Sequence, residues 1–309
     1  MPAFPFSFVW QKLRSMFPFN FFSPIERLRY EPFYKKNYTV DIKRDDLIHP
    51  FISGNKWRKL KYLLQDAHKN GRNHLVTFGG AWSNHLLATA AAAASFGFKS
   101  TGFVRGEPVD NANLKLCQLF GMQLIFVERE AYRNKQHVFD RYFGQHKYAY
   151  FINEGGASSL ALLGCAEIID ELRTDYDHIF CACGTGTTLA GLSMGLKQRN
   201  QQTKLHGVSV LAGGDFLLED IKKLYDEADN ITIHTSYHFG GYAKTKPPLM
   251  DFTKSFVSST GVLIEPVYTA KTFYALMDLI ENNYFQEGAR ILVLHTGGLI
   301  GILGKIDEF

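Results

Sequence analysis

Two lysines one helical turn apart are the first candidates for covalent chemistry. Lys56 and Lys59 follow a glycine turn in the segment Ser53-Gly54-Asn55-Lys56-Trp57-Arg58-Lys59, where a helix is expected to begin. Cations at a helix N-terminus oppose the helix dipole, so their clustering there calls for an explanation. A like charge nearby and a dehydrated pocket both lower the pKa of an amine, which makes Lys56 a candidate nucleophile. The competing interpretation, a solvated basic face, is the better one for such a run taken alone.

A loop of glycines and threonines is a candidate anion site. Gly184-Thr185-Gly186-Thr187-Thr188 follows the apolar run 178–183 and precedes an expected helix. Glycines let the backbone approach an anion, and the free amides of a helix start can hold a phosphate together with threonine hydroxyls. The loop lacks the lysine of a P-loop. Leu189 stands where the dinucleotide fingerprint needs its third glycine, which disfavours a Rossmann-type dehydrogenase. Phosphate binding and a threonine-capped turn are equally good interpretations of this loop alone.

Three more loops carry polar side chains. In Gly79-Gly80-Ala81-Trp82-Ser83-Asn84, Ser83 suits a helix N-cap, and spacing alone favours that role. The alternative is that Ser83 and Asn84 display a hydroxyl and an amide into the cleft of the phosphate loop. Tyr268 and Thr296 stand in loops beside apolar segments. The hydroxyls of such residues normally form hydrogen bonds with nearby groups and need no further role.

The elements that carry these loops alternate between strand and helix from about residue 38. Alternation of this kind predicts an α/β fold of parallel sheets with helices on both faces, and ligands that bind beyond the carboxyl ends of the strands. Strands are predicted at 38–43, 74–78, 100–105, 123–127, 148–152, 178–183, 204–211, 231–234 and 290–295, and helices at 56–70, 83–96, 111–120, 132–143, 158–172, 187–197, 216–228 and 270–283.

Composition excludes several classes of function. The 309 residues suit one large or two modest domains, and the net charge of +4 is spread without the basic block that nucleic-acid binding requires. The longest apolar stretch, residues 86–98, is too short to span a bilayer. The four cysteines show no CxxC spacing, so we expect no metal and a reducing compartment, the cytoplasm.

The N-terminal arm is rich in aromatic residues. Eight of them lie between residues 4 and 22, without the basic start and cleavage site of a signal peptide. Scattered prolines argue against an amphipathic helix, so we expect the arm to pack on the body or on a partner subunit rather than on a membrane.

Together these segments resemble the family of 1-aminocyclopropane-1-carboxylate (ACC) deaminases and D-cysteine desulfhydrases. These are pyridoxal 5′-phosphate (PLP) enzymes of the tryptophan synthase β-subunit fold. The resemblance runs from about Ser23 to the C-terminus. It is carried by Ile42-Lys43-Arg44-Asp45-Asp46, Gly54-Asn55-Lys56, Arg58-Lys59-Leu60, Gly79-Gly80, Ser83-Asn84-His85, Glu154-Gly155-Gly156, the loop 184–188, Pro266-Val267-Tyr268 with Lys271, and His295-Thr296-Gly297-Gly298.

The resemblance implies a role for each candidate residue. Lys56 forms a Schiff base with PLP, and Thr296 sits by the pyridine nitrogen of the cofactor. Asn84 bonds the ring hydroxyl, while Lys59 and the loop Gly184, Thr185, Gly186, Thr187 and Thr188 hold the phosphate. Ser83 lies near the substrate carboxylate or transfers protons, and Tyr242 and Tyr268 face the substrate.

The resemblance also implies an architecture. PLP lies in the cleft between two parallel-sheet domains. Residues 58–157 form the small domain, and residues 1–57 and 158–309 form the large one. The expected assembly is a homodimer, and the expected partner is a small amino-acid substrate.

Two departures bear on the reaction. ACC deaminases carry an acidic residue after the tyrosine that matches Tyr268, whereas this chain has Thr269, as the desulfhydrases do. A hydroxyl does not keep the pyridine nitrogen protonated, so the electron sink is weaker. Trp82 replaces a smaller or polar residue and is expected to narrow the pocket.

The departures favour β-elimination of D-cysteine to pyruvate, ammonia and sulfide, with Lys56 as the base. The alternatives are an ACC deaminase that yields 2-oxobutyrate, a racemase or eliminase of another small amino acid, and a non-catalytic PLP-binding protein.

Overall fold

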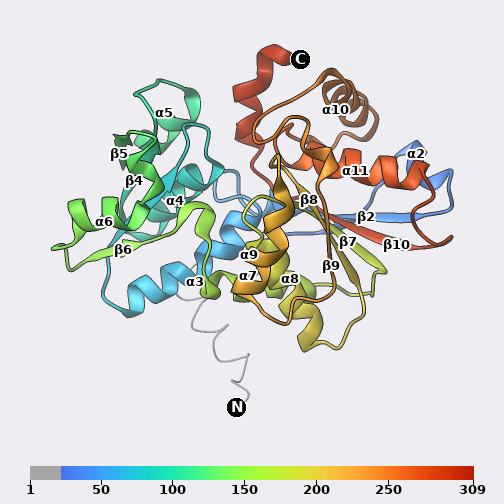
Figure 1. Cartoon of the computed structure of the whole chain (residues 1–309), viewed down its shortest axis with the longest axis horizontal. Helices are drawn as coiled ribbons and strands as arrows, with labels where there is room; N and C mark the ends of the chain where they lie inside the picture. The colour runs from blue at the N-terminus through green and yellow to red at the C-terminus, as the bar shows by residue number, and fades with distance from the viewer. Residues whose placement is uncertain (1–21) are drawn as a thin grey trace.

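Two separate sheets, one in each lobe, organise the computed structural model, which describes residues 22–309 (Figure 1). The large sheet has six strands in the order β1-β2-β10-β7-β8-β9, and the small sheet has four in the order β5-β4-β3-β6. Apart from Phe22, the aromatic arm lies outside the described residues.

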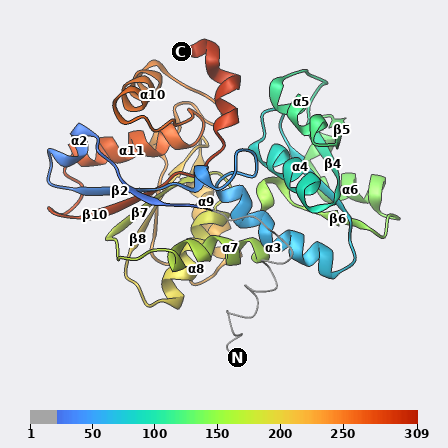
Figure 2. The ribbon, with the colours of Figure 1, turned by 180° about the vertical axis from the view of Figure 1, so that it is seen from behind.

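The large sheet is sandwiched between two groups of helices (Figures 1 and 2). Alternate residues of its strands face opposite sides: Ile291 and Val293 pack in one core, Leu292 and Leu294 in the other. One face carries α2 (Glu31–Tyr34), α10 (Pro247–Thr260) and α11 (Thr269–Glu281), and the other carries α7 (Ser159–Asp170), α8 (Thr187–Gln198) and α9 (Leu217–Leu224). The strands are β1 (Ile25–Arg27), β2 (Thr39–Lys43), β7 (His178–Cys183), β8 (Lys204–Ser209), β9 (Ile231–His234) and β10 (Arg290–Leu294).

The small sheet is parallel throughout. Its strands are β3 (His74–Gly79), β4 (Lys99–Arg105), β5 (Met122–Val127) and β6 (Ala149–Phe151). Helices α3 (Asn55–Lys69), α4 (Asn84–Phe96) and α5 (Ala112–Leu119) cover one face, and α6 (Lys135–Phe143) covers the other. The predicted fold class, α/β with two parallel-sheet lobes and helices on both faces, is therefore confirmed.

The structure contains elements that the sequence analysis did not predict. Strand β1 is antiparallel to β2, an exception at the edge of an otherwise parallel sheet. Helix α10 was not predicted, although it begins with two prolines, which are favoured in the first turn because their missing N–H costs nothing there. A C-terminal 3-10 segment, η6 (Leu299–Glu308), was also missed. The small-sheet strands fall between residues 74 and 151, and the domain boundaries at 57/58 and 157/158 stay predictions.

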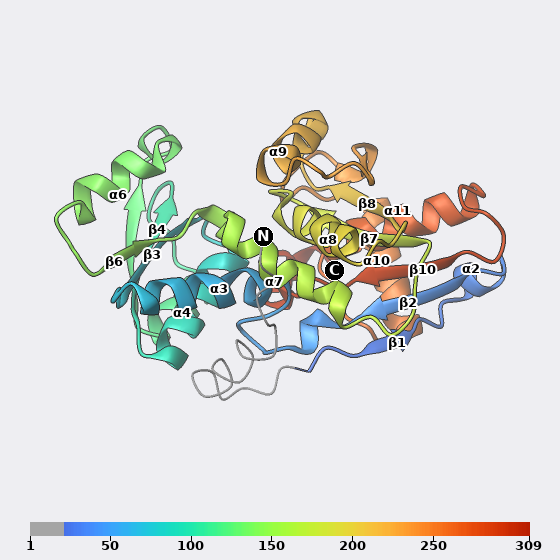
Figure 3. The same cartoon turned by 90° about the horizontal axis from the view of Figure 1, so that it is seen from below.

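Helix α3 lies at the junction of the lobes, against α7 (Figure 3). A Cβ on Gly164 of α7 would stand 1.8 Å from the carbonyl oxygen of Arg58, so only glycine permits this backbone contact. The guanidinium of Arg58 donates to both carboxylate oxygens of Asp45, at 3.0 and 2.8 Å, and pairs with Glu171. Lys43 pairs with the same glutamate at 2.7 Å. This buried ion cluster anchors the first turn of α3.

The ion cluster predicts a pH-dependent contribution to stability. Burial raises the pKa of Glu171, but Arg58 and Lys43 outweigh it and lower the pKa from 4.5 to about 2. Because the folded-state pKa lies below the unfolded one, the stabilisation is complete above about pH 4.5 and is lost as the pH falls toward about 2. We expect Glu171→Gln to remove roughly 1–2 kcal/mol of unfolding free energy at neutral pH, allowing for partial exposure, and less at acidic pH.

Urea unfolding of wild type and variant between about pH 3 and pH 7 measures this difference. Glu31→Gln, which removes an exposed carboxylate paired with Lys35, is the control and should cost little at any pH. A stability difference for Glu171→Gln that does not change with pH would contradict the assignment.

Candidate active site

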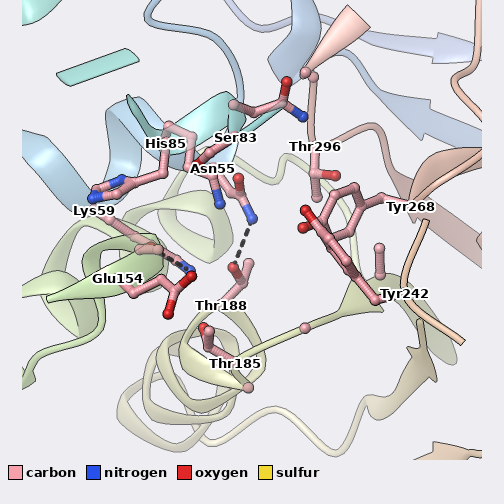
Figure 4. Close-up of a pocket in the computed structure, with 18 of the residues that line it drawn as sticks. Asn55, Lys59, Ser83, His85, Glu154, Thr185, Thr188, Tyr242, Tyr268 and Thr296 are labelled. Carbon is pink, nitrogen blue, oxygen red and sulfur yellow. Dashed lines mark hydrogen bonds between the residues drawn. The ribbon is translucent and has the colours of Figure 1, made fainter. Parts of the chain in front are cut away.

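A cavity of about 340 Å³ lies where the carboxyl ends of strands from both sheets meet (Figure 4). It is of the size that small-molecule sites occupy. The structure brings all the candidate residues to this cavity except Thr187, which is fully buried and does not line it. Those that line it are Lys56, Lys59, Ser83, Asn84, Gly184, Thr185, Gly186, Thr188, Tyr242, Tyr268 and Thr296.

Two glycines let distant segments meet at the cavity. Gly54 has a φ of +60°, and a Cβ there would stand 1.8 Å from the carbonyl oxygen of Thr296. The amide of Asn55 donates to that same oxygen at 3.3 Å. Gly298 has a φ of +81°, and its Cβ would stand 2.3 Å from Nδ2 of Asn84. These contacts join the start of α3, the end of β10 and the start of α4.

The lysines are not a solvated face. Lys59 is 3% exposed and donates to the carbonyl oxygen of Gly155 at 3.4 Å. Burial, followed by the charge of Lys59, lowers the pKa of Lys56 to about 7. Burial also lowers the pKa of Lys59. A large fraction of Lys56 is therefore a neutral amine near neutral pH, the nucleophilic form.

The glycine–threonine loop leaves a helix start open to the cavity. Helix α8 begins after Gly186, which has a φ of +73°, and no side chain caps it, so the interpretation as a threonine cap is wrong. The hydroxyls of Thr185 and Thr187 are 3.1 Å apart, and Thr188 accepts from Nδ2 of Asn55 at 3.1 Å. Uncapped amides beside Lys59 form a site suited to a phosphate.

Ser83 has both of its alternative roles at once. Its hydroxyl caps α4 by accepting from the amide of Leu86 at 3.3 Å, and it lines the cavity. The loop before it is held by Asn113, which is 1% exposed and donates to the carbonyl oxygens of Ala81 and Ser83 at 3.1 and 3.4 Å.

Trp82 does not line the cavity, so the expected narrowing of the pocket by its indole is absent. The ring packs instead on the C-terminal segment η6. A Cβ on Gly304 would stand 2.9 Å from it.

Tyr242 and Tyr268 form an edge-to-face pair with ring centroids 6.0 Å apart. Their phenol oxygens lie close together and point into the cavity (Figure 4). Burial raises the pKa of both phenols, so both stay protonated at neutral pH. Lys271 of α11 donates to the carbonyl oxygens of His238 and Gly241, at 2.8 and 2.9 Å, and so ties the loop of Tyr242 to the helix that Tyr268 precedes.

The side chain of Thr269 is turned away from the cavity. It is 1% exposed, and its hydroxyl accepts from the amide of Glu265 at 2.8 Å. The Glu265 carboxylate in turn accepts from the amides of Val267, Tyr268 and Thr269, each at 2.8 Å, and caps α11. Residue 269 thus belongs to a helix cap, and Thr296 is the threonine whose hydroxyl reaches the cavity near Tyr268 (Figure 4).

His85 lines the cavity but received no role from the sequence. Oγ1 of Thr77 donates to the carbonyl oxygen of Ile152 at 2.9 Å, so Nε2 of His85, 2.8 Å away, is assigned as the donor to it. Nδ1 is buried, and among the described residues no side-chain or backbone group meets hydrogen-bond geometry with it, although the backbone of Asn153 lies near the ring. Burial, with Lys56 and Lys59, holds the pKa of His85 well below its usual value, so the ring is neutral.

Arg105 and Glu154 also line the cavity without an assigned role. A signal for Arg105 was present in the sequence: it ends a strand expected in a parallel sheet, at the edge where ligands bind.

The described residues lack two features of other classes of protein. None of the helices in residues 22–309 is long and apolar enough to cross a membrane. Within the same residues, no three histidine, cysteine or acidic side chains gather as metal ligands would.

Comparison with known proteins identifies the family of the chain. The family model described as "Pyridoxal-phosphate dependent enzyme" matches residues 19–297. The bifunctional D-cysteine desulfhydrase/1-aminocyclopropane-1-carboxylate deaminase of Arabidopsis thaliana is 32% identical, over 86% of this chain and 74% of its own. The D-cysteine desulfhydrase of Yersinia pestis is 30% identical, over 84% of this chain and 86% of its own. A crystal structure of an ACC deaminase homologue superposes with a TM-score of 0.83 at 29% identity, covering 96% of this chain and 98% of that one.

The fold, the site and these similarities define a PLP-dependent lyase. The chain belongs to the pyridoxal-phosphate-dependent enzyme family, among the ACC deaminases and D-cysteine desulfhydrases. The cavity suits the family's cofactor, because it combines an amine of lowered pKa with an uncapped helix start beside a second lysine.

The contact between Gly298 and Asn84 predicts an effect on cofactor affinity. Gly298→Ala should displace the Asn84 amide and raise the Kd of PLP about tenfold, the worth of one hydrogen bond in a buried site. Titration of the apoenzyme with PLP, followed by visible absorption, measures the Kd. Gly261→Ala is the matched control, because Gly261 has a φ of +69° but open space around it. Equal PLP affinity in the two variants would rule out this role of the contact.

Proposed function

We propose that this enzyme catalyses β-elimination from D-cysteine to pyruvate, ammonia and sulfide. The proposal rests on the identity of the polar side chain that the cavity offers to the pyridine ring of PLP, the hydroxyl of Thr296. Residue 269 is a threonine engaged in a helix cap, and the hydroxyl of Thr296 lines the cavity. Glu154 is the one acidic side chain among the described lining residues, and it lies beside Lys59, across the cavity from Thr296 (Figure 4).

Each cofactor contact is assigned to a residue of this chain. Lys56 holds PLP covalently, and Asn84 bonds its ring hydroxyl. Lys59 and the loop 184–188 bind the phosphate. PLP, once bound, supplies the electron sink that the reaction requires.

Lys56, Tyr242 and Tyr268 are the residues to which we assign acid–base roles. An amine of pKa about 7 takes up a proton from the substrate Cα efficiently near neutral pH. Tyr242 and Tyr268 stay protonated, and each is able to donate a hydrogen bond at the substrate side. The hydroxyl of Ser83 donates a hydrogen bond to the substrate carboxylate.

ACC deamination is the second candidate, because relatives bear both activities in their names. A hydroxyl beside the pyridine nitrogen leaves that nitrogen largely unprotonated, which weakens the electron sink. Elimination of a thiolate tolerates a weak sink, since the leaving group takes the electron pair. Opening the ring of ACC offers no such leaving group.

We also propose a cytoplasmic homodimer. The four cysteines, at 117, 165, 181 and 183, are buried and free, as suits a reducing compartment. Light scattering on the purified enzyme tests the subunit count.

Covalent labelling tests the assignment of Lys56. Borohydride reduction of the yellow holoenzyme, followed by peptide mass mapping, should locate the pyridoxyl group on Lys56. The Lys56→Ala variant is the control and should stay unlabelled. An adduct on Lys43, Lys59 or Lys271 would refute the assignment.

Product assays test the choice of reaction. We expect kcat/KM for D-cysteine, from pyruvate and sulfide, to exceed that for ACC, from 2-oxobutyrate, by at least about tenfold. Thr269→Glu should not confer ACC turnover, because the new carboxylate enters the cap of α11 rather than the cavity. Thr269→Ser keeps the capping hydroxyl and should behave as wild type. Faster turnover of ACC than of D-cysteine by the wild-type enzyme would overturn the proposal and leave the PLP assignment standing.

A further inference from the structure

Arg105 lies on the wall of the cavity that the small lobe provides. It ends β4, its side chain is exposed, and it lines the same cavity as Lys56. Its Nη2 atom lies 3.8 Å from where a Cβ on Gly80 would stand, so the guanidinium runs along the loop that carries Ser83.

The guanidinium is held in position without being neutralised. It lies over the ring of Tyr132, 5.8 Å from the ring centroid. In the described part of the chain, no carboxylate comes within ion-pair distance of Arg105. Glu154, the acidic side chain of the cavity, is paired with Lys135 at 3.1 Å. Arg105 therefore retains its full capacity to bind an anion.

Of the basic side chains in the cavity, Arg105 is the one that the cofactor does not engage under the proposed function. The described residues that line the cavity include three basic side chains, Lys56, Lys59 and Arg105. The cofactor occupies Lys56 as an imine and engages Lys59 through its phosphate, under the proposed function. The remaining anion is the carboxylate of the amino acid, and the remaining cation is Arg105.

Arg105 also acts on the side of the cavity that faces the substrate. Burial raises the pKa of Tyr242, and the charge of Arg105 opposes that rise. The guanidinium thus lies beside the loop of Ser83 and within electrostatic range of Tyr242.

We propose that Arg105 binds the α-carboxylate of the substrate, with the hydroxyl of Ser83 as a second donor, and so selects amino acids over simple amines. A guanidinium offers a carboxylate two parallel N–H donors, a geometry that a lysine does not match. The inference rests on the proposed amino-acid substrate.

Binding of two ligands that differ only in the carboxylate tests the inference. Glycine and methylamine are titrated into the holoenzyme, and the change in visible absorption of the bound cofactor gives each Kd. Arg105→Gln should raise the Kd of glycine about tenfold, the worth of a charge-assisted hydrogen bond at a partly exposed site, and leave methylamine unchanged. Added salt should weaken glycine binding to wild type more than to the variant.

Arg129→Gln is the matched control. Arg129 is also exposed and lies next to Gly106, but it does not line the cavity, so the same loss of charge should leave both Kd values unchanged. If Arg105→Gln binds glycine as wild type does, or weakens both ligands equally, the inference is wrong. If wild type responds to neither glycine nor D-cysteine, the proposed function itself fails.

Discussion

The backbone contact between Gly54 and Thr296 is the constraint on which the site depends. It joins the start of α3 to the end of β10, and a Cβ at Gly54 would stand 1.8 Å from the Thr296 carbonyl oxygen. The φ of +60° at Gly54 is a second reason why this position requires glycine. Lys56 lies in the first turn of α3, two residues after Gly54. Gly298, two residues after Thr296, packs on Asn84. One close approach thus brings together an amine, a hydroxyl and an amide from three separate elements.

The contact is useful only because α3 is held from its other side. Arg58 faces away from the cavity and bonds Asp45 and Glu171, and Gly164 allows α7 to lie directly on the backbone of α3. Further along, Leu60 and Leu64 of the same helix enter the core of the small lobe. Helix α3 therefore supports the lysine and connects the lobes, so the position of one lobe relative to the other is set at the base of the site.

The sequence predicts the strands and helices that carry the site closely, because apolar periodicity and glycine punctuation agree there. The loops collect as expected, since the carboxyl ends of parallel strands share an edge. What the sequence does not give is side-chain direction. Thr269 was expected to matter beside the pyridine ring, but a cap built by Glu265 turns it inward. Trp82 was expected to narrow the pocket, but a glycine in η6 offers it a surface elsewhere. Both side-chain orientations depend on contacts that the spacing of apolar residues does not reveal.

Burial shifts the pKa values of several side chains that line the cavity. It lowers the pKa of Lys56 to about 7, keeps His85 neutral, and keeps the phenols of Tyr242 and Tyr268 protonated. Under the proposed function, the group beside the ring nitrogen is the hydroxyl of Thr296, which does not keep that nitrogen protonated, so the cofactor is a weak sink for negative charge that develops on the substrate. Elimination disposes of the charge on a departing thiolate, which a neighbouring phenol is able to protonate. Ring opening keeps the charge on carbon until a proton arrives. The preference for a substrate with a leaving group therefore follows from the hydroxyl that the proposed function places beside the ring nitrogen.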